Sequence, residues 1–323
     1  MSRLDEIRRP VQREMEAFEQ RFKQAMSSKA PLLDKVTHYI VRRKGKQVRP
    51  LFVFLSAGLA GGVRESTYVG AVLVELLHTA TLVHDDVVDD AHLRRGFFSI
   101  NALWKNKIAV LVGDYLLSKG LLHALHHREH QLLDLVSDAV RKMSEGELLQ
   151  MEKARKLDIT EEVYFDIISN KTASLMAGCC AVGVASAGAD LDWVEKARVF
   201  GEQVGLAFQI KDDLLDLGND PTGKSSGVDL KEKKMTLPLI HALEKAGSGE
   251  KRRIMKLVRS DEMNPTKTKE VVRFMHDWGG IDYARNRMMG LRDEALRLLH
   301  QFPDNPCRTS LADLVAFTVD RSR

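Results

Sequence analysis

Apolar side chains recur with the period of an α-helix along almost the whole chain, and this pattern restricts the fold more than any other feature of the sequence. No segment shows the strict alternation of polar and apolar residues that marks a half-buried strand. The pattern predicts an all-α protein. Helices are expected over about residues 3–26, 31–43, 50–60, 66–90, 107–126, 130–154, 160–188, 191–217, 235–247, 249–259, 266–276, 280–301 and 308–320.

The sequence contains no long linker, repeat or low-complexity tract that would divide it. Its 323 residues, 44% of them hydrophobic, are enough to bury a large core. We therefore predict one domain over residues 1–323, built as a single large helical bundle.

Composition argues against several classes of protein. Lys+Arg 49 against Asp+Glu 45 gives a net charge of +4, too small to indicate a nucleic-acid partner. Cys179, Cys180 and Cys307 form no CxxC pair, which argues against a zinc site or a disulfide framework and fits a reducing cytoplasm. Residues 1–21 are charged throughout, and the longest apolar run, residues 176–189, is shorter than the roughly 20 residues of a membrane span. The sequence thus predicts neither a signal peptide nor a transmembrane segment.

A cluster of aspartates, Asp85-Asp86-Val87-Val88-Asp89, closes a strongly helical segment. Asp85 and Asp89 are four residues apart and share a helix face, with Asp86 beside them. Carboxylates this close repel one another unless a cation offsets their charge. Mg²⁺ is often held by one or two carboxylates together with substrate phosphates. One such motif is equally compatible with a solvated acidic helix end.

The same spacing returns in Asp212, Asp213 and Asp216, again at the end of a long apolar helix. Carboxylates are unfavourable at the negative end of the helix dipole, so both helices give up some stability there. Local conflicts of this kind tend to mark functional sites. Two copies therefore favour metal binding over two acidic helix ends.

Basic residues occur where an anionic substrate of such a metal would need them. Arg94 and Arg95 follow the first motif, and arginine can bind a phosphate through two parallel hydrogen bonds. Lys46 and Arg49 precede a predicted helix start, a position that favours anions. His78 lies seven residues before the first motif, on nearly the same helix face. Each alone would be an ordinary surface or core residue, but together they indicate a phosphate-binding site.

Six passages resemble the polyprenyl synthetase family, the trans-isoprenyl diphosphate synthases, in both order and spacing. They lie within about residues 44–239 and read GKQVRP at 45–50, ELLHTATLVHDDVVDDAHLRRG at 75–96, VGDYLL at 112–117, SNKTASL at 169–175, FQIKDDLLD at 208–216 and GKSSGVDLKEKKMTLPL at 223–239.

The resemblance implies a helical bundle of the isoprenoid synthase type around a central cavity. It implies that isopentenyl diphosphate is joined to an allylic diphosphate (dimethylallyl, geranyl or farnesyl) after ionisation of the allylic C–O bond. The product would be a linear all-trans polyprenyl diphosphate. More than one Mg²⁺ per active site and a homodimer are further implications.

The resemblance also implies roles for individual residues. The metal ligands would be Asp85, Asp86, Asp89, Asp212, Asp213 and Asp216. The allylic diphosphate would contact Arg94, Lys171, Lys224 and Lys234, and the reacting carbons would lie near Thr172 and Gln209. Isopentenyl diphosphate would bind at Gly45, Lys46, Arg49, His78 and Arg95. The chain departs from the family where Lys233-Lys234 replaces the usual Gly-Lys.

Product length is expected to depend on Leu77, Ala80 and Thr81. Thr81 is one helical turn before Asp85 on nearly the same face, and Ala80 adjoins it. In the family, bulky aromatic residues at these two positions stop chain growth early. Both are small here, and Leu77 continues the helix without an aromatic ring. A product longer than farnesyl, from geranylgeranyl to octaprenyl, is therefore expected.

Three alternatives use the same helical pattern. A non-catalytic regulatory subunit of a heteromeric prenyl synthase would usually lack motif aspartates, which are complete here. A class I terpene cyclase would need one aspartate motif and no isopentenyl diphosphate site. A structural helical scaffold would account for the apolar periodicity but for none of the charge placement.

Overall fold

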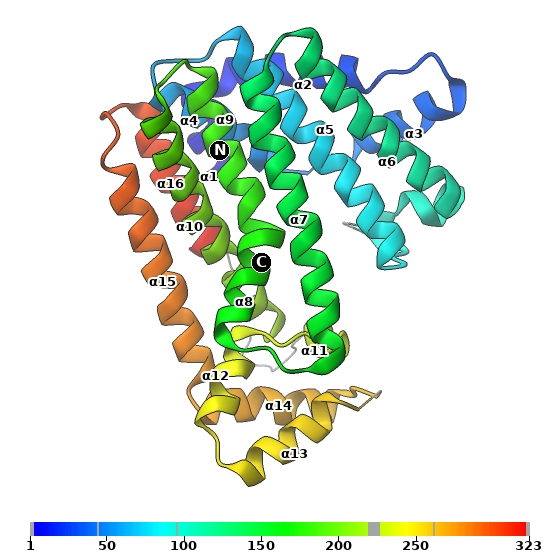
Figure 1. Cartoon of the computed structure of the whole chain (residues 1–323), viewed down its shortest axis with the longest axis vertical. Coiled ribbons are helices and arrows are strands. Elements are labelled where there is room, and N and C mark those ends of the chain that lie inside the picture. Colours follow the sequence, from blue (N-terminus) through cyan, green and yellow to red (C-terminus); the bar gives the residue numbers. More distant parts are fainter. Residues whose placement is uncertain (1–2, 44, 95, 219–226, 261, 321–323) are drawn as a thin grey trace. The chain divides into compact units, whose positions relative to one another are not determined.

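The computed structural model describes residues 3–43, 45–94, 96–218, 227–260 and 262–320. The described chain is almost entirely helical, as the periodicity predicts (Figure 1). Its internal contacts divide it into two compact units. Unit 1 comprises Met1–Val140, Gly178–Arg198 and His300–Leu311, and unit 2 comprises Arg141–Ala177, Val199–Leu299 and Ala312–Arg323. The expectation of one domain stays a prediction.

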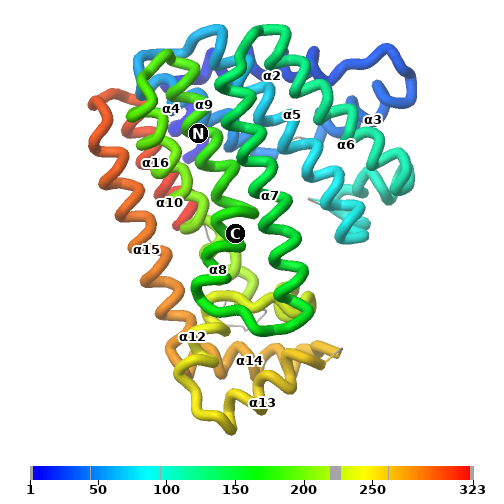
Figure 2. The backbone as a smooth tube through the Cα atoms, viewed as in Figure 1, coloured from blue at the N-terminus to red at the C-terminus, as the bar shows by residue number. Residues whose placement is uncertain are grey.

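The elements fall into three groups. Unit 1 contains α1 (Arg3–Arg8), η1 (Arg9–Val11), α2 (Gln12–Met26), α3 (Pro31–Arg42), α4 (Val48–Leu59), α5 (Glu65–Val88), β1 (Leu93–Arg94), β2 (Phe97–Phe98) and α6 (Ile100–His126). Unit 2 contains α8 (Glu161–Ile168), η2 (Ser169–Ala173), α11 (Val228–Lys231), α12 (Leu237–Lys245), α13 (Ser248–Val258), α14 (Pro265–Asp277) and α15 (Gly280–Leu299). Four helices have residues in both units, and their path can be followed in Figure 2: α7 (His130–Lys156), α9 (Ser174–Ser186), α10 (Leu191–Asp216) and α16 (Pro306–Asp320).

The core of unit 1 places α5, which carries the first aspartate motif. The ring of Phe54 on α4 packs edge-on against Phe18 of α2 at 6.0 Å and against Tyr68 of α5 at 5.2 Å between centroids. Helices α5 and α6 pack extensively against each other. A side chain at Gly120 of α6 would collide with Leu77 of α5, so the glycine permits this close approach. The last turn of α5 is thus fixed by packing along the rest of the helix.

The core of unit 2 forms around α12, which contacts α8, α14 and α15. Leu237 and Ile240 of α12 share one buried cluster with Phe274 of α14 and Ala284 of α15. The same cluster includes Ile210 of α10, three residues before the buried aspartate of the second motif. Burial of apolar side chains therefore anchors the end of α10 that carries this motif.

Several local features differ from the sequence expectations. Pro10 lies in the short 3₁₀ segment η1, which separates α1 from α2 where one helix was expected. Residues 160–188, also expected as one helix, form α8, the five-residue π-turn η2 and then α9. Two short strands, β1 and β2, pair antiparallel, although no strand was expected. Two residues are too few to show an alternating pattern.

Within the part of the chain that the structure describes, three helical segments are long and apolar enough to span a membrane by length and composition alone: Glu65–Val88, Ile100–His126 and Glu161–Ser186. The buried share of their apolar windows is 67%, 33% and 78%, respectively. Packing within the protein accounts for the apolar character of the first and third segments. The middle segment, α6, keeps much of its apolar surface exposed, and the absence of a membrane span stays a prediction.

Candidate active site

The first aspartate motif lies at the end of α5, where the helix stops at Val88 and Asp89 forms its C-cap. Asp86 is buried, Asp85 is half-buried and Asp89 is exposed. Arg94 of β1 donates from Nε to Asp86 Oδ1 at 2.6 Å. Burial raises the pKa of the Asp86 carboxyl, and the Arg94 guanidinium opposes this rise. The motif and the predicted phosphate ligand Arg94 therefore lie together.

The remaining predicted residues of unit 1 lie on α5 and at the start of α4. His78 is 5% exposed on α5, two turns before the motif. Lys46 precedes α4, as expected, whereas Arg49, expected just before the helix, lies in its first turn because α4 begins at Val48. Gln47 takes a left-handed conformation, with φ 51°, which turns the chain into the helix. Arg95 lies outside the described residues.

The second motif contains a connected set of hydrogen bonds in unit 2. Asp213 of α10 is 5% exposed. Its Oδ1 accepts from Gln209 Nε2 at 2.9 Å, and its Oδ2 accepts from the Tyr164 hydroxyl at 2.7 Å. Thr172 Oγ1 in turn donates to Gln209 Oε1 at 2.8 Å. Thr172 and Gln209, predicted near the reacting carbons, and Asp213, a predicted metal ligand, therefore form one network.

Lys171 and Thr172 lie in the π-turn η2. Lys171 Nζ forms an ion pair with Glu147 Oε2 at 2.5 Å and donates to Gln150 Oε1 at 3.3 Å, both on α7. A side chain at Gly146 would meet the Lys171 backbone nitrogen at 2.6 Å, so the glycine permits this approach of α7. π-Turns inside helices often occur at functional sites. Here the turn carries the two predicted residues of the SNKTA segment.

Asp216 ends α10 and accepts backbone N–H bonds from Val228 at 3.2 Å and Asp229 at 3.0 Å, at the start of α11. Lys234 contacts Glu232 at 2.7 Å and Asp229 at 3.3 Å. The chain reaches Lys234 through Lys233, which takes a left-handed φ of 57°. The family's glycine would adopt this φ without strain, and lysine adopts it here at a cost of about 1 kcal/mol. Lys224 lies outside the described residues.

Sequence reasoning missed three residues of this site: Tyr164, Glu147 and Gln150. Tyr164 and Asp213 are 49 residues apart, so no local spacing joins them. The one local signal was a tyrosine at a buried position, because a buried hydroxyl usually has a hydrogen-bond partner.

Burial raises the pKa of the Asp213 carboxyl to about 7, against the opposing hydrogen bonds from Tyr164 and Gln209. The folded state therefore binds this proton more tightly than the unfolded chain, whose ordinary value is 3.8. It follows that the carboxyl stabilises the fold below about pH 4 and that this contribution is lost as the pH rises to about 7.

Asp213→Asn is accordingly expected to stabilise the metal-free protein at pH 8. The asparagine amide can accept from Gln209 and donate to the Tyr164 hydroxyl without carrying a charge. We expect a gain of about 2 kcal/mol, or roughly 3–5 °C in Tm, at pH 8 in chelator. Thermal unfolding followed by circular dichroism measures it, and the gain should shrink toward pH 4. An equal Tm for both proteins at pH 8 would contradict the assigned pKa.

The carboxylates of both motifs fit Mg²⁺ by their donor chemistry. Among the described residues, no three His, Cys, Asp or Glu side chains are already gathered as a metal cage. Mg²⁺ needs no such cage, since it usually keeps one or two carboxylates and completes its octahedron with phosphate oxygens and water. The raised pKa of Asp213 shows that its negative charge is incompletely offset by the protein alone. A cation would supply the missing compensation.

Known proteins resemble this chain over nearly its whole length. Residues 30–275 match the polyprenyl synthetase family. The chain is 33% identical to octaprenyl diphosphate synthase of Escherichia coli (strain K12), over 99% of both chains. A decaprenyl diphosphate synthase structure from Rhodobacter capsulatus has a TM-score of 0.93 and 34% identity, covering 99% of both chains.

A polyprenyl synthase from Caulobacter crescentus CB15, complexed with calcium and isoprenyl diphosphate, has a TM-score of 0.90 and 32% identity. It matches over 99% of this chain and 98% of its own. These likenesses extend over both units and establish the isoprenoid synthase fold. The chain therefore belongs to the polyprenyl synthetase family, whose members are magnesium-dependent prenyltransferases.

Proposed function

We propose that the protein condenses isopentenyl diphosphate with an allylic diphosphate (dimethylallyl, geranyl or farnesyl) and releases a linear all-trans polyprenyl diphosphate. The observation that carries this proposal is the network of Thr172, Gln209 and the buried Asp213 beside Lys171. Asp213 provides a carboxylate that would bind a metal, and Lys171 provides a cation that would bind a diphosphate. Thr172 and Gln209 provide neutral dipoles that would lie near a reacting carbon. The full-length likeness to named polyprenyl diphosphate synthases supports the same reaction.

The chain's own residues would act on the leaving diphosphate. Arg94, Lys171 and Lys234 are each held by a carboxylate, and so the protein orients their charges before substrate arrives. Preorganised charges of this kind stabilise the negative charge that develops as the allylic C–O bond breaks. The oxygens of Thr172 and Gln209 would face the allylic cation. Carbon–carbon bond formation with isopentenyl diphosphate then places the cation on the new chain, and the released pyrophosphate takes the proton that restores the double bond.

Mg²⁺ bound at the two motifs would neutralise diphosphate charge. The ligands we assign are Asp85, Asp86, Asp89, Asp212, Asp213 and Asp216. Six carboxylates in two groups support more than one ion, since each ion takes only one or two of them. Asp216 would also have a structural role, because its oxygens accept backbone N–H bonds from residues at the start of α11.

Isopentenyl diphosphate is assigned to the start of α4, to His78 of α5 and to Arg95. Lys46 and Arg49 supply positive charge where α4 begins, and the preceding Gly45 is assigned to the same site. A helix start favours a phosphate through its free backbone N–H groups. The buried His78 belongs to the proposed set. Arg95, which lies outside the described residues, completes it.

One assay separates this function from its alternatives. Purified protein is incubated with labelled isopentenyl diphosphate, Mg²⁺ and each allylic primer in turn, and the products are separated by chain length. We expect elongation beyond farnesyl. No product from the chain alone would indicate a regulatory subunit. A hydrocarbon released from the primer without isopentenyl diphosphate would indicate a cyclase.

Tyr164→Phe is expected to weaken catalysis through Asp213. The substitution keeps the buried ring but removes the hydroxyl that donates to Asp213 Oδ2. Loss of such a supporting bond to a metal-binding group typically costs about 10- to 100-fold in activity or metal affinity. Steady-state rates over a Mg²⁺ titration measure both. A lowered Tm with an unchanged Mg²⁺ requirement would show that the hydroxyl has only a structural role.

We also propose a homodimer formed through α6. Leu111 and Leu122 are 64% and 50% exposed and lie three turns apart on one side of the helix, with Leu125 close to the same side. Replacing Leu111 and Leu122 together by Glu is expected to give a monomer, because two buried charges would oppose association. Light scattering measures the molar mass. Leu191→Glu, at a 74% exposed leucine of α10, is the control and should remain dimeric.

We place the protein in the cytoplasm. Cys179, Cys180 and Cys307 are all free and buried, which suits a reducing compartment. Burial raises the pKa of the Cys180 thiol to about 12, so this group stays protonated and unreactive at neutral pH.

A further inference from the structure

Helix α13 presents a basic face that the reaction does not use. Lys251, Arg252, Lys256 and Arg259 are all exposed. At 100° per residue, all four fall within a sector of about 140° around the axis of the helix and its C-cap. Ile254 and Val258, which are fully buried, fall outside this sector, in an adjoining part of the helix surface. The buried residues of α13 therefore pack into unit 2, and the exposed sector beside them is a stripe of positive charge.

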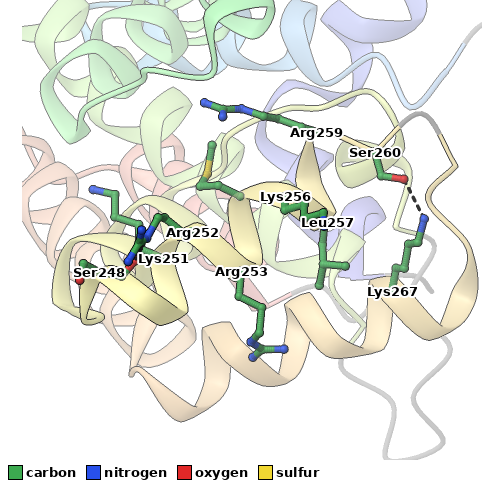
Figure 3. Close-up of a pocket in the computed structure, with 10 residues that line it drawn as sticks. Ser248, Lys251, Arg252, Arg253, Lys256, Leu257, Arg259, Ser260 and Lys267 are labelled. Atoms are coloured by element: carbon green, nitrogen blue, oxygen red, sulfur yellow. Dashed lines mark hydrogen bonds between the residues drawn. The ribbon is translucent and has the colours of Figure 1, made fainter.

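None of these four basic residues forms an ion pair with another described residue. The neighbouring Arg253 behaves differently, because it pairs with Glu250 and with Glu270 of α14. Figure 3 shows Arg253 extending toward α14 and Arg259 extending to the other side of α13. Ion pairs within the protein thus neutralise Arg253, which lies between α13 and α14, whereas the charges of the four exposed basic residues stay uncompensated.

The basic stripe borders a pocket of about 880 Å³ that also contains apolar side chains (Figure 3). Met255 and Leu257 are half-buried and line it between the basic residues. Ser248 and Ser260 add hydroxyl groups at its two ends, and Lys267 of α14 donates to Ser260 Oγ at 2.7 Å. Basic residues with partly accessible apolar side chains between them are suited to bind a partner surface that is charged on the outside and apolar beneath.

We propose that the α13 face, defined as Lys251, Arg252, Met255, Lys256 and Arg259, docks the protein on an anionic phospholipid surface. Basic residues near such a surface are attracted by its negative potential, and an adjoining apolar group adds to the binding. Single-stranded nucleic acid is the less suitable polyanion, because no aromatic residue lines the pocket for base stacking. A polyprenyl chain partitions into membranes, so docking would place the protein that makes this chain at the membrane that takes it up. Of the reasons given, only this one rests on the proposed function.

The test is co-sedimentation of the full chain with vesicles of equal parts phosphatidylglycerol and phosphatidylcholine. The variant replaces the four basic residues by Gln: K251Q, R252Q, K256Q and R259Q. Each basic side chain near an anionic surface contributes about 5-fold to partitioning at low salt, so we expect a loss of at least roughly 100-fold. Binding of the wild type should also weaken as salt rises, since the interaction is screened over a Debye length.

A matched control removes the same charge elsewhere in unit 2. Its four arginines, on α14 and α15, each pair with a nearby carboxylate: R273Q, R285Q, R292Q and R297Q. The control should retain vesicle binding, and both variants should keep prenyl transfer in detergent. If the wild type binds vesicles but shows no prenyl transfer, the proposed function is rejected and the docking proposal is retained.

Four results would overturn the docking proposal. They are no binding of the wild type to anionic vesicles, equal binding to phosphatidylcholine alone, equal binding by the α13 variant, and equal loss in the control. A free phosphate is the other anion that the same basic residues would bind, and calorimetry with inorganic phosphate tests this binding. Phosphate binding that the α13 variant loses, without vesicle binding, would assign the pocket to a soluble anion instead.

Discussion

Asp85→Ala and Asp212→Ala are each expected to lower kcat by about a thousandfold or more while leaving the fold intact. Each substitution removes a carboxylate from one of the two motifs, and with it part of the charge that holds metal against the diphosphate. Both aspartates are half-buried near a helix end, so their loss creates no large cavity. Steady-state assays at saturating Mg²⁺ measure the rate, and circular dichroism measures Tm.

Asp192→Ala is the control for these two variants. Asp192 lies on the same helix as Asp212 and pairs on the surface with Lys196 at 2.7 Å. Exposed ion pairs contribute little, so both rate and Tm should stay close to wild type. The double variant lacking Asp85 and Asp212 should lose much less than the product of the single losses, since residues that act in one step are strongly non-additive. Near-normal turnover in both single variants would refute the assignment of the motifs.

Ala80→Phe is expected to shorten the product to farnesyl or below. Ala80 is 1% exposed on α5, and Leu77 is likewise 1% exposed one turn earlier, so the added ring must occupy space inside the protein. Thr81 beside it is fixed by its hydroxyl, which donates to the His78 carbonyl at 2.8 Å. Chain-length analysis of the products, with farnesyl diphosphate and shorter primers, measures the shift.

The control for this substitution is Ala80→Ser, which adds one atom where phenylalanine adds a ring. It should leave product length unchanged. Overpacking a core typically costs about 1–3 kcal/mol, so Tm should be recorded to show that Ala80→Phe still folds. If the wild type already stops at farnesyl, the small residues at positions 80 and 81 do not set product length.

Several groupings of residues in the candidate site could be predicted, because the sequence patterns that indicate them are local. The two aspartate motifs repeat one short spacing, and a spacing of four residues on a helix fixes a common face whatever surrounds it. Arg94 follows the first motif so closely that a short turn brings it back, and the structure places its Nε 2.6 Å from Asp86. The helical fold was predictable for the same reason, since burial of one helix face requires apolar residues at regular intervals.

Local departures were harder to predict. Lys105 interrupts α6 with φ 73°, and the helix expected from residue 107 matches only the part after this break. The π-turn at Lys171 and Thr172 leaves the apolar periodicity of its neighbours almost unchanged, so the pattern reads as one helix. At the π-turn the backbone geometry depends on a separate helix, because Gly146 of α7 permits the close approach of the Lys171 backbone.

The sequence by itself determined which residue types and spacings could bind a metal and a diphosphate, and which helices would carry them. Only the tertiary structure decided how those residues are held. It gave Asp213 a tyrosine partner 49 positions away, gave Lys171 a glutamate partner on α7 and turned Asp216 toward α11. The physical reason is that helix periodicity records burial, whereas hydrogen bonds and desolvation depend on which distant side chains share the same buried volume.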